Sequence, residues 1–151
     1  MEELKRCYRM ARFIGIVLIG SLLIYTVMVE IFKSMAFPVK DVSPGFDPEM
    51  VRYPFFGIAL FQFYVIRWIR RRLLSKKRDV QTLLTTTIIT YALCESVAIL
   101  GLILFFLGRS SFDFYLFLVL SLIYFYLFFP RYAQWEEWTN TYLPSEQEGR
   151  N

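Results

Sequence analysis

The chain has 151 residues, of which 56% are hydrophobic, 19% aromatic and 20% charged, and its formal net charge is +4 at pH 7. Soluble domains contain roughly 45–50% apolar residues, so this excess, with a mean hydropathy of +0.44, predicts segments that meet lipid. The sequence has no histidine, which excludes histidine-ligated haem, HExxH-type zinc chemistry, histidine proton relays and a Ser-His-Asp triad. Two cysteines, Cys7 and Cys94, are too few for a disulfide framework or a four-thiolate metal site.

Four apolar segments come close to the roughly 20 residues that a membrane-spanning helix needs. They cover approximately residues 13–32, 53–69, 83–107 and 112–129. Ser110, three residues before Asp113, predicts a helix cap at the start of the fourth segment, and Pro130 closes it. The expected fold class is therefore all-α, an integral membrane four-helix bundle.

We expect residues 1–143 to form a single transmembrane helical domain, followed by a polar, disordered tail over 144–151. The proline-rich segment 33–52 is predicted to be an irregular extracytoplasmic loop. The basic segment 70–82 is predicted to be a cytoplasmic loop.

The lysines and arginines indicate the orientation. Thirteen of 17 fall before the first span, from Arg67 at the end of the second span to Arg78, or after the fourth span. The other side has Lys33, Lys40, Arg52 and Arg109. Positive charge favours the cytoplasmic side, so the sequence predicts a protein of the cytoplasmic (inner) membrane with both termini cytoplasmic. Near that interface we expect the aromatic residues Trp68, Tyr132, Trp135 and Trp138.

A cleaved signal peptide is the alternative for the start of the chain, because basic residues, an apolar run and Ser34-Met35-Ala36 follow one another. The apolar run exceeds the roughly 7–15 residues of a signal-peptide core. A retained first span is therefore the favoured interpretation.

Glu95 is an acidic residue at the midpoint of the third apolar segment. A charged carboxylate there costs at least ~2.5–3.5 kcal/mol, so we expect it to be protonated, paired or next to a wet cavity, and it is the candidate ion or proton site. Cys94, Ala98 and Gly101 share one helix face and predict a close helix contact. The supporting polar layer is expected to comprise Gln62, Ser121, Ser21 and Tyr91, with Gln62 or Ser121 as the hydrogen-bond partner of Glu95.

The stretch LCESVAILGLIL, residues 93–104, resembles the carboxylate-bearing helix of the rotor-ring c subunits of F- and V-type ATPases. The preceding basic segment corresponds to the cytoplasmic hairpin loop of that family. The resemblance implies that Glu95 stands at the position of the ion-carrying carboxylate. Two features differ from the family: the second span has Gly57 alone in place of a glycine-rich stripe, and the first and fourth spans have no counterpart.

A second candidate site is a basic cluster that could contact anionic lipid at about 1 kcal/mol per residue. It comprises Arg70, Arg71, Arg72, Lys76, Lys77 and Arg78. Such a cluster can equally serve only to fix the topology. The segment 131–143 has aromatic residues at helix-compatible spacing, and it could lie along the membrane interface or contact a partner.

The residues contain no P-loop, G-x-S-x-G motif or metal-ligand set, so we expect no enzymatic activity, cofactor, metal or nucleic-acid partner. The expected partners are the lipid bilayer and other membrane subunits or further copies of the chain. Two functions follow: helix packing as an accessory or assembly component or homo-oligomer, and proton or cation handling through Glu95.

Overall fold

The computed structural model describes residues 2–35, 48–76, 80–108 and 110–142, with the side chains of 48–49, 74–76, 134, 138 and 140–142 left aside. These residues are almost entirely helical and contain no strand, which confirms the all-α prediction for the described part. The helices in chain order are α1 (Glu2–Ser34), α2 (Pro48–Lys76), α3 (Val80–Gly108), α4 (Ser111–Phe128) and α5 (Tyr132–Tyr142).

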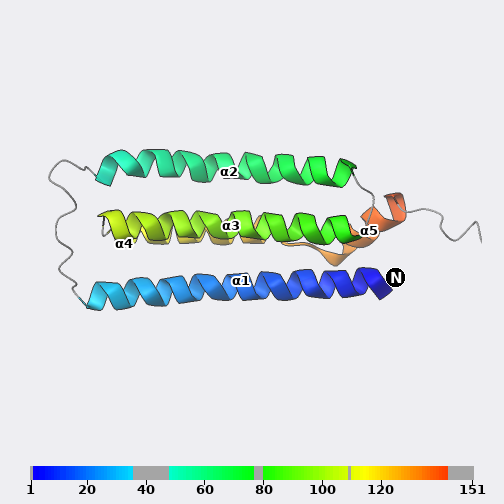
Figure 1. Cartoon of the computed structure of the whole chain (residues 1–151), viewed down its shortest axis with the longest axis horizontal. Helices are drawn as coiled ribbons and strands as arrows, with labels where there is room; N and C mark the ends of the chain where they lie inside the picture. Colours follow the sequence, from blue (N-terminus) through cyan, green and yellow to red (C-terminus); the bar gives the residue numbers. More distant parts are fainter. Residues whose placement is uncertain (1, 36–47, 77–79, 109, 143–151) are drawn as a thin grey trace, which may run out of the picture.

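The four long helices run alongside one another, and α3 is the central one (Figure 1). It packs against α1, α2 and α4, whereas α1 and α2 lie on opposite sides of it. The start of α1, the end of α2 and the short helix α5 are all at the same end of the molecule (Figure 1). Residues on α3 can therefore contact three neighbouring helices at one depth.

Among the described helices, α1, α3 and α4 are long and apolar enough to cross a membrane. Helix α2 has 29 residues but is not among them. Its apolar stretch between Arg52 and Arg67 has only 14 residues and includes the polar Gln62 and the weakly apolar Tyr53 and Tyr64. The predicted fold is thus confirmed in its coarser form: the described part is all-α, and three of its helices are long and apolar enough to cross a membrane.

Two predicted loops are shorter than expected. Helix α2 already begins at Pro48, within the predicted loop 33–52, because proline lacks only an N–H that has no partner in the first turn of a helix. At its other end, α2 continues through Arg70–Lys76, within the predicted loop 70–82, because Arg, Leu and Lys are good helix formers. The remaining positions of these loops, 36–47 and 77–79, and the predicted tail lie outside the described residues.

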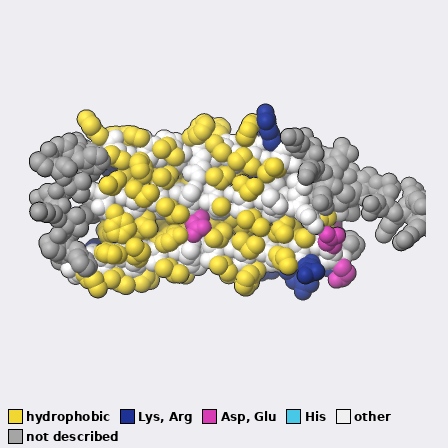
Figure 2. Space-filling view, in the orientation of Figure 1, with side chains coloured by type: hydrophobic (Ala, Val, Ile, Leu, Met, Phe, Trp, Pro, Cys, Tyr) yellow, Lys and Arg dark blue, Asp and Glu magenta, His cyan; other side chains and the backbone are white. Residues whose placement is uncertain are grey.

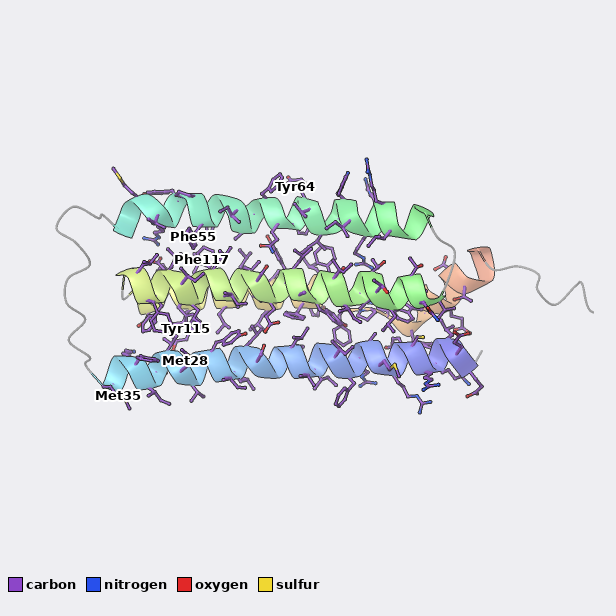
Figure 3. The ribbon with its side chains drawn as sticks, in the orientation of Figure 1. Met28, Met35, Phe55, Tyr64, Tyr115 and Phe117 are labelled. Atoms are coloured by element: carbon purple, nitrogen blue, oxygen red, sulfur yellow. The ribbon has the colours of Figure 1, made fainter. Side chains whose placement is uncertain are left out.

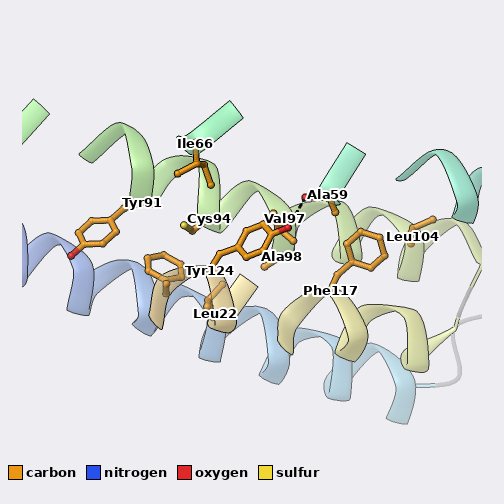
Figure 4. Close-up of a cluster of buried hydrophobic side chains, with 11 residues drawn as sticks. Leu22, Ala59, Ile66, Tyr91, Cys94, Val97, Ala98, Leu104, Phe117 and Tyr124 are labelled. Atoms are coloured by element: carbon orange, nitrogen blue, oxygen red, sulfur yellow. Dashed lines mark hydrogen bonds between the residues drawn. The ribbon is translucent and has the colours of Figure 1, made fainter. Parts of the chain in front are cut away.

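The main core cluster draws side chains from all four long helices (Figure 4). The predicted small-residue face of Cys94, Ala98 and Gly101 is buried, and Cys94 and Ala98 belong to this cluster. A Cβ atom at Gly101 would lie 2.5 Å from the Cβ of Phe117, so the backbones of α3 and α4 approach closely at this point. The sequence prediction of a close helix contact is confirmed.

The start of α4 agrees with the sequence, whereas α5 packs against α1 of the same chain, a position that the sequence did not predict. Ser110 caps α4, since its Oγ accepts a hydrogen bond of 3.3 Å from the Asp113 backbone N–H. The segment 131–143 contains helix α5, whose Trp135 is only 4% exposed. A second core cluster surrounds this ring and comprises Leu4, Cys7, Ala11, Leu83 and Trp135. Helix α5 therefore contacts the start of α1.

Candidate functional site

One turn of α3, residues Leu93–Ser96, receives hydrogen bonds from three neighbouring helices. We call these four residues the polar turn. The central position of α3 allows this arrangement, because successive residues of a helix point toward different neighbours. A polar layer around the middle of α3 thus exists, and the bonds that the side chains of α1, α2 and α4 make to the polar turn each join two helices.

Glu95 is bonded to α1. Its Oε1 atom accepts hydrogen bonds from Ser21 Oγ at 2.6 Å and from the Tyr25 hydroxyl at 2.8 Å. Ser21 and Tyr25 are four residues apart, so they lie on one face of α1. The expectation that Gln62 or Ser121 would bond to Glu95 is wrong, because those two side chains approach α3 from α2 and α4 and meet other residues of the polar turn.

Ser21 also forms a contact within its own helix. Its Oγ atom lies 2.6 Å from the carbonyl oxygen of Leu18 and 2.6 Å from Glu95 Oε1. The Ser21 hydroxyl therefore lies between the backbone of α1 and the carboxyl group of α3.

Glu95 is not enclosed by the bundle, because its side chain is only partly buried. Figure 2 shows an acidic group midway along a face on which hydrophobic side chains predominate, with further charged groups near the end where α1 begins. The carboxyl group of Glu95 is therefore accessible from outside the bundle.

Gln62 connects α2 to the polar turn. Its Nε2 atom donates to the Leu93 carbonyl oxygen at 2.9 Å and also bonds to Ser96 Oγ. Ser96 Oγ in turn donates to the Leu93 carbonyl at 2.8 Å. This amide therefore satisfies two groups of α3 with its two hydrogens.

Helix α4 contributes the remaining bonds. The buried Ser121 donates to the Cys94 carbonyl oxygen at 2.7 Å. One turn along α4, the Tyr124 hydroxyl donates to the Ala59 carbonyl oxygen of α2 at 2.9 Å, the dashed contact in Figure 4. Polar side chains thus connect α4 both to α3 and to α2.

Tyr91 was expected in the polar layer, but the structure places it apart from it. Its side chain is fully buried, and its hydroxyl has no hydrogen-bond partner among the described residues. The ring packs on Phe125, with 5.5 Å between the centroids. A Cβ at Gly15 would lie 2.9 Å from the Tyr91 hydroxyl oxygen. Tyr91 therefore contributes to packing beside α1 and not to the bonded network.

The sequence analysis missed Tyr25, Ser96 and Tyr124. Tyr25 and Tyr124 each carry a signal, because they lie four and three residues after the predicted layer residues Ser21 and Ser121 and so share their helix faces. Ser96 is adjacent to Glu95 and is polar at the same depth.

The charged side chains at the two ends of the molecule have different partners. At the end where α1 finishes and α2 begins, they form ion pairs: Arg52 Nε lies 2.9 Å from Asp113 Oδ1, and Lys33 Nζ lies 3.8 Å from Glu30 Oε1. At the other end, the guanidinium of Arg72 stacks on the Trp68 ring at 4.5 Å, and that of Arg70 lies 5.5 Å from the Phe128 centroid.

Of the predicted anionic-lipid contacts, Arg70, Arg71 and Arg72 lie together in the last part of α2. Lys77, Arg78 and the side chain of Lys76 lie outside the described part, as does the side chain of Trp138.

Comparison with known proteins gives no relative: no family model, curated protein or solved structure matches this chain. The resemblance of residues 93–104 to rotor-ring c subunits therefore stays a prediction. Within the described residues, three or more cysteine, aspartate or glutamate side chains do not gather as a metal site would require. The chemistry that the polar turn can perform is hydrogen bonding between helices and reversible protonation of one carboxyl group.

Proposed function

We propose that this chain is an integral protein of the cytoplasmic membrane that works through helix packing, as an accessory or assembly component of a larger membrane complex or as a homo-oligomer. The observation that supports this best is the polar turn. Its hydrogen bonds join α3 to α1, α2 and α4, so polar side chains at mid-membrane depth are used to fix the bundle. Interhelical bonds of this kind determine register in membranes.

A topology of four spans with both termini cytoplasmic is part of the proposal. Helix α2 lies alongside the three membrane-spanning candidates (Figure 1). Its 29 residues extend over about 43 Å at 1.5 Å per residue. Its last part carries Arg70–Arg72, whereas at the opposite end Arg52 and Lys33 are paired with acids. The net positive charge is therefore concentrated at the end we assign to the cytoplasm.

The outer surface also supports association as the mode of action. Large hydrophobic side chains cover the outside of α1 and α4, with Leu23, Ile24 and Val119 each more than half exposed. The face in Figure 2 is apolar along most of its length, with charged groups gathered near the end where α1 begins. Such a surface can contact lipid and other membrane helices.

The topology can be tested by cysteine labelling of intact cells in a Cys7→Ser, Cys94→Ser background. Met50, which is 76% exposed, and Glu3 lie at opposite ends of the bundle. We expect a membrane-impermeant maleimide to label Met50→Cys directly and Glu3→Cys only after permeabilisation. Labelling of both from outside, or the reverse pattern, would contradict the topology.

Assembly can be tested by native mass spectrometry of the full chain extracted from membranes in a mild detergent. A monomer has a mass of 18.0 kDa, and we expect a larger protein species that persists in Glu95→Gln, because glutamine keeps the size of the side chain. An 18.0 kDa species alone, at native expression and in several detergents, would contradict the proposal.

Proton or cation handling through Glu95 is the second candidate. Two observations favour it. The hydroxyl groups of Ser21 and Tyr25 both donate to one oxygen of the Glu95 carboxyl group, and the Glu95 side chain is only partly buried. Dicyclohexylcarbodiimide reacts with protonated carboxyl groups in lipid. This candidate predicts an adduct at Glu95 that disappears at high pH.

The two candidates make opposite predictions for proton flux into liposomes that contain the full chain. In Glu95→Gln, ion handling predicts loss of flux with assembly retained. Helix packing predicts the same flux as in the parent protein and in a Glu30→Gln control, whose carboxyl lies at the membrane edge and is about half exposed.

A further inference from the structure

The outer face of α2 carries an apolar groove that no other part of the described structure fills. It is lined by Phe61, Tyr64, Val65 and Trp68. The exposed fractions of the three aromatic residues are 66%, 69% and 56%. Figure 3 shows Tyr64 on the side of α2 that faces away from α3, opposite Phe55. The residues are spaced by three and four positions, so they form one continuous helix face.

This face begins at the middle of the membrane, because Phe61 is adjacent to Gln62, which bonds to the polar turn. From Phe61 to Arg72 the helix rises by about 16 Å. One leaflet contributes about half of the ~30 Å hydrocarbon thickness of a bilayer. This stretch of the face thus has the length of an acyl chain that spans one leaflet.

The other end of the same face is basic. Arg72 follows Trp68 by one helical turn, and its guanidinium stacks on the indole ring at 4.5 Å. Arg71 is also exposed. Among the described residues, neither arginine forms an ion pair with a carboxylate. Two cations therefore stand where the groove reaches the headgroup level, and Trp68 is a side chain typical of that depth.

We propose that this face of α2 is a binding site for one anionic phospholipid of the cytoplasmic leaflet. Arg71 and Arg72 bind the headgroup phosphate, Trp68 packs at the glycerol level, and one acyl chain lies along Tyr64 toward Phe61 at the middle of the membrane. Charge complementarity identifies the occupant, since a second copy of the chain would bring its own arginines to the same place. The inference rests on the proposed membrane-spanning placement of α2 but not on the proposed assembly function.

The first test is native mass spectrometry of the full chain released from vesicles of equal parts phosphatidylglycerol and phosphatidylcholine. The parent protein is expected to retain phosphatidylglycerol in preference. Arg71→Gln with Arg72→Gln is expected to reduce that preference by roughly tenfold or more. The matched control is Arg9→Gln with Arg12→Gln, which removes two exposed arginines of α1 at the same end of the molecule and should keep the preference.

The second test places the lipid in the groove. Phosphatidylglycerol brominated on its acyl chains should quench Trp68 fluorescence, with the signal of a Trp68→Phe variant subtracted to remove the other tryptophans. Brominated phosphatidylglycerol should quench Trp68 more strongly than brominated phosphatidylcholine does. This difference between the two lipids should disappear in the variant with both Arg71→Gln and Arg72→Gln. Trp135 is only 4% exposed and should be quenched equally by both lipids.

Several results would overturn the proposal. Equal retention and quenching by both lipids would show ordinary boundary lipid. An equal loss of preference in the Arg9, Arg12 control would show a diffuse charge effect. Protection of Trp68 from both lipids, together with a dimer mass, would show that a second copy covers the face. A unimodal unfolding transition in each variant ensures that a lost preference reflects the site. None of these readouts depends on whether the protein assembles with other subunits.

Discussion

The two interfaces that α3 makes with α4 and with α1 are built on different principles. Against α4 the small face of α3 allows close approach, and a single added atom at Gly101 would lie 2.5 Å from the Cβ of Phe117. Against α1 the contact depends on a carboxyl group that accepts bonds from Ser21 and Tyr25. The first interface depends on close approach at a glycine. The second combines a close approach, of Gly15 to Tyr91, with hydrogen-bond donors that must be present.

This difference matters in a membrane, where lipid is as apolar as a leucine side chain and the hydrophobic effect does not drive helices together. Close packing gains dispersion energy from many contacts at once, whereas an interhelical hydrogen bond contributes about 0.6 kcal/mol on average. The comparison therefore predicts that overpacking the α4 interface is more damaging than removing hydrogen bonds at the α1 interface.

The largest effect is expected for Gly101→Ala. The new methyl would meet the Phe117 Cβ and, at 3.3 Å, the Phe114 carbonyl oxygen, and neither can rotate away. Overpacking of this kind costs about 1–3 kcal/mol. Reversible unfolding in mixed micelles, followed by circular dichroism, should show this loss of free energy of unfolding.

The matched control is Gly57→Ala, at a position where the added methyl meets no atom within 4 Å. This change should be neutral or stabilising by up to about 1 kcal/mol, since alanine has the higher helix propensity. If Gly57→Ala were as damaging as Gly101→Ala, the close approach of α3 to α4 would not be the cause.

Glu95→Ala should have the next largest effect. It removes the acceptor of Ser21 and Tyr25 and leaves their hydroxyls without that partner, which should cost about 1–2 kcal/mol for two interhelical bonds. Glu95→Gln should cost less than half as much. Disulfide trapping between cysteines introduced into α1 and α3 would measure the separation of these helices. Equal stability of the alanine variant and the parent would contradict a packing role for this carboxyl.

Gln62→Leu should have a smaller effect than Glu95→Ala. Leucine keeps an apolar contact with α3 but cannot donate to the Leu93 carbonyl or bond to Ser96. We expect a loss of about 0.5–1.5 kcal/mol, measured by the same unfolding assay. The matched control is Gln62→Glu, whose protonated form has one hydrogen to donate and should recover part of the loss.

The sequence was sufficient for the features that depend on one helix at a time. The apolar stretches, the Ser110 cap and the small face of α3 were all predicted. The partner of Glu95 was not, because that choice depends on which helix faces which side of α3, and periodicity within one helix does not contain this information. The ends of α2 were placed too far inward because the boundary of an apolar run is not the boundary of a helix, which basic residues can extend.

Ser121→Ala should have the smallest effect, and it tests whether the α4 interface depends on close packing or on a hydrogen bond. Ser121 is fully buried at the α4 interface, yet its single bond goes to a backbone carbonyl, that of Cys94. A helical carbonyl already accepts a bond within its own helix and keeps it when the hydroxyl is removed. The expected loss is therefore about 0.6 kcal/mol or less. Thr87→Val is the control, because Thr87 bonds only within α3, to Leu83, and a loss much larger than that control would show that the α4 interface also depends on its donor.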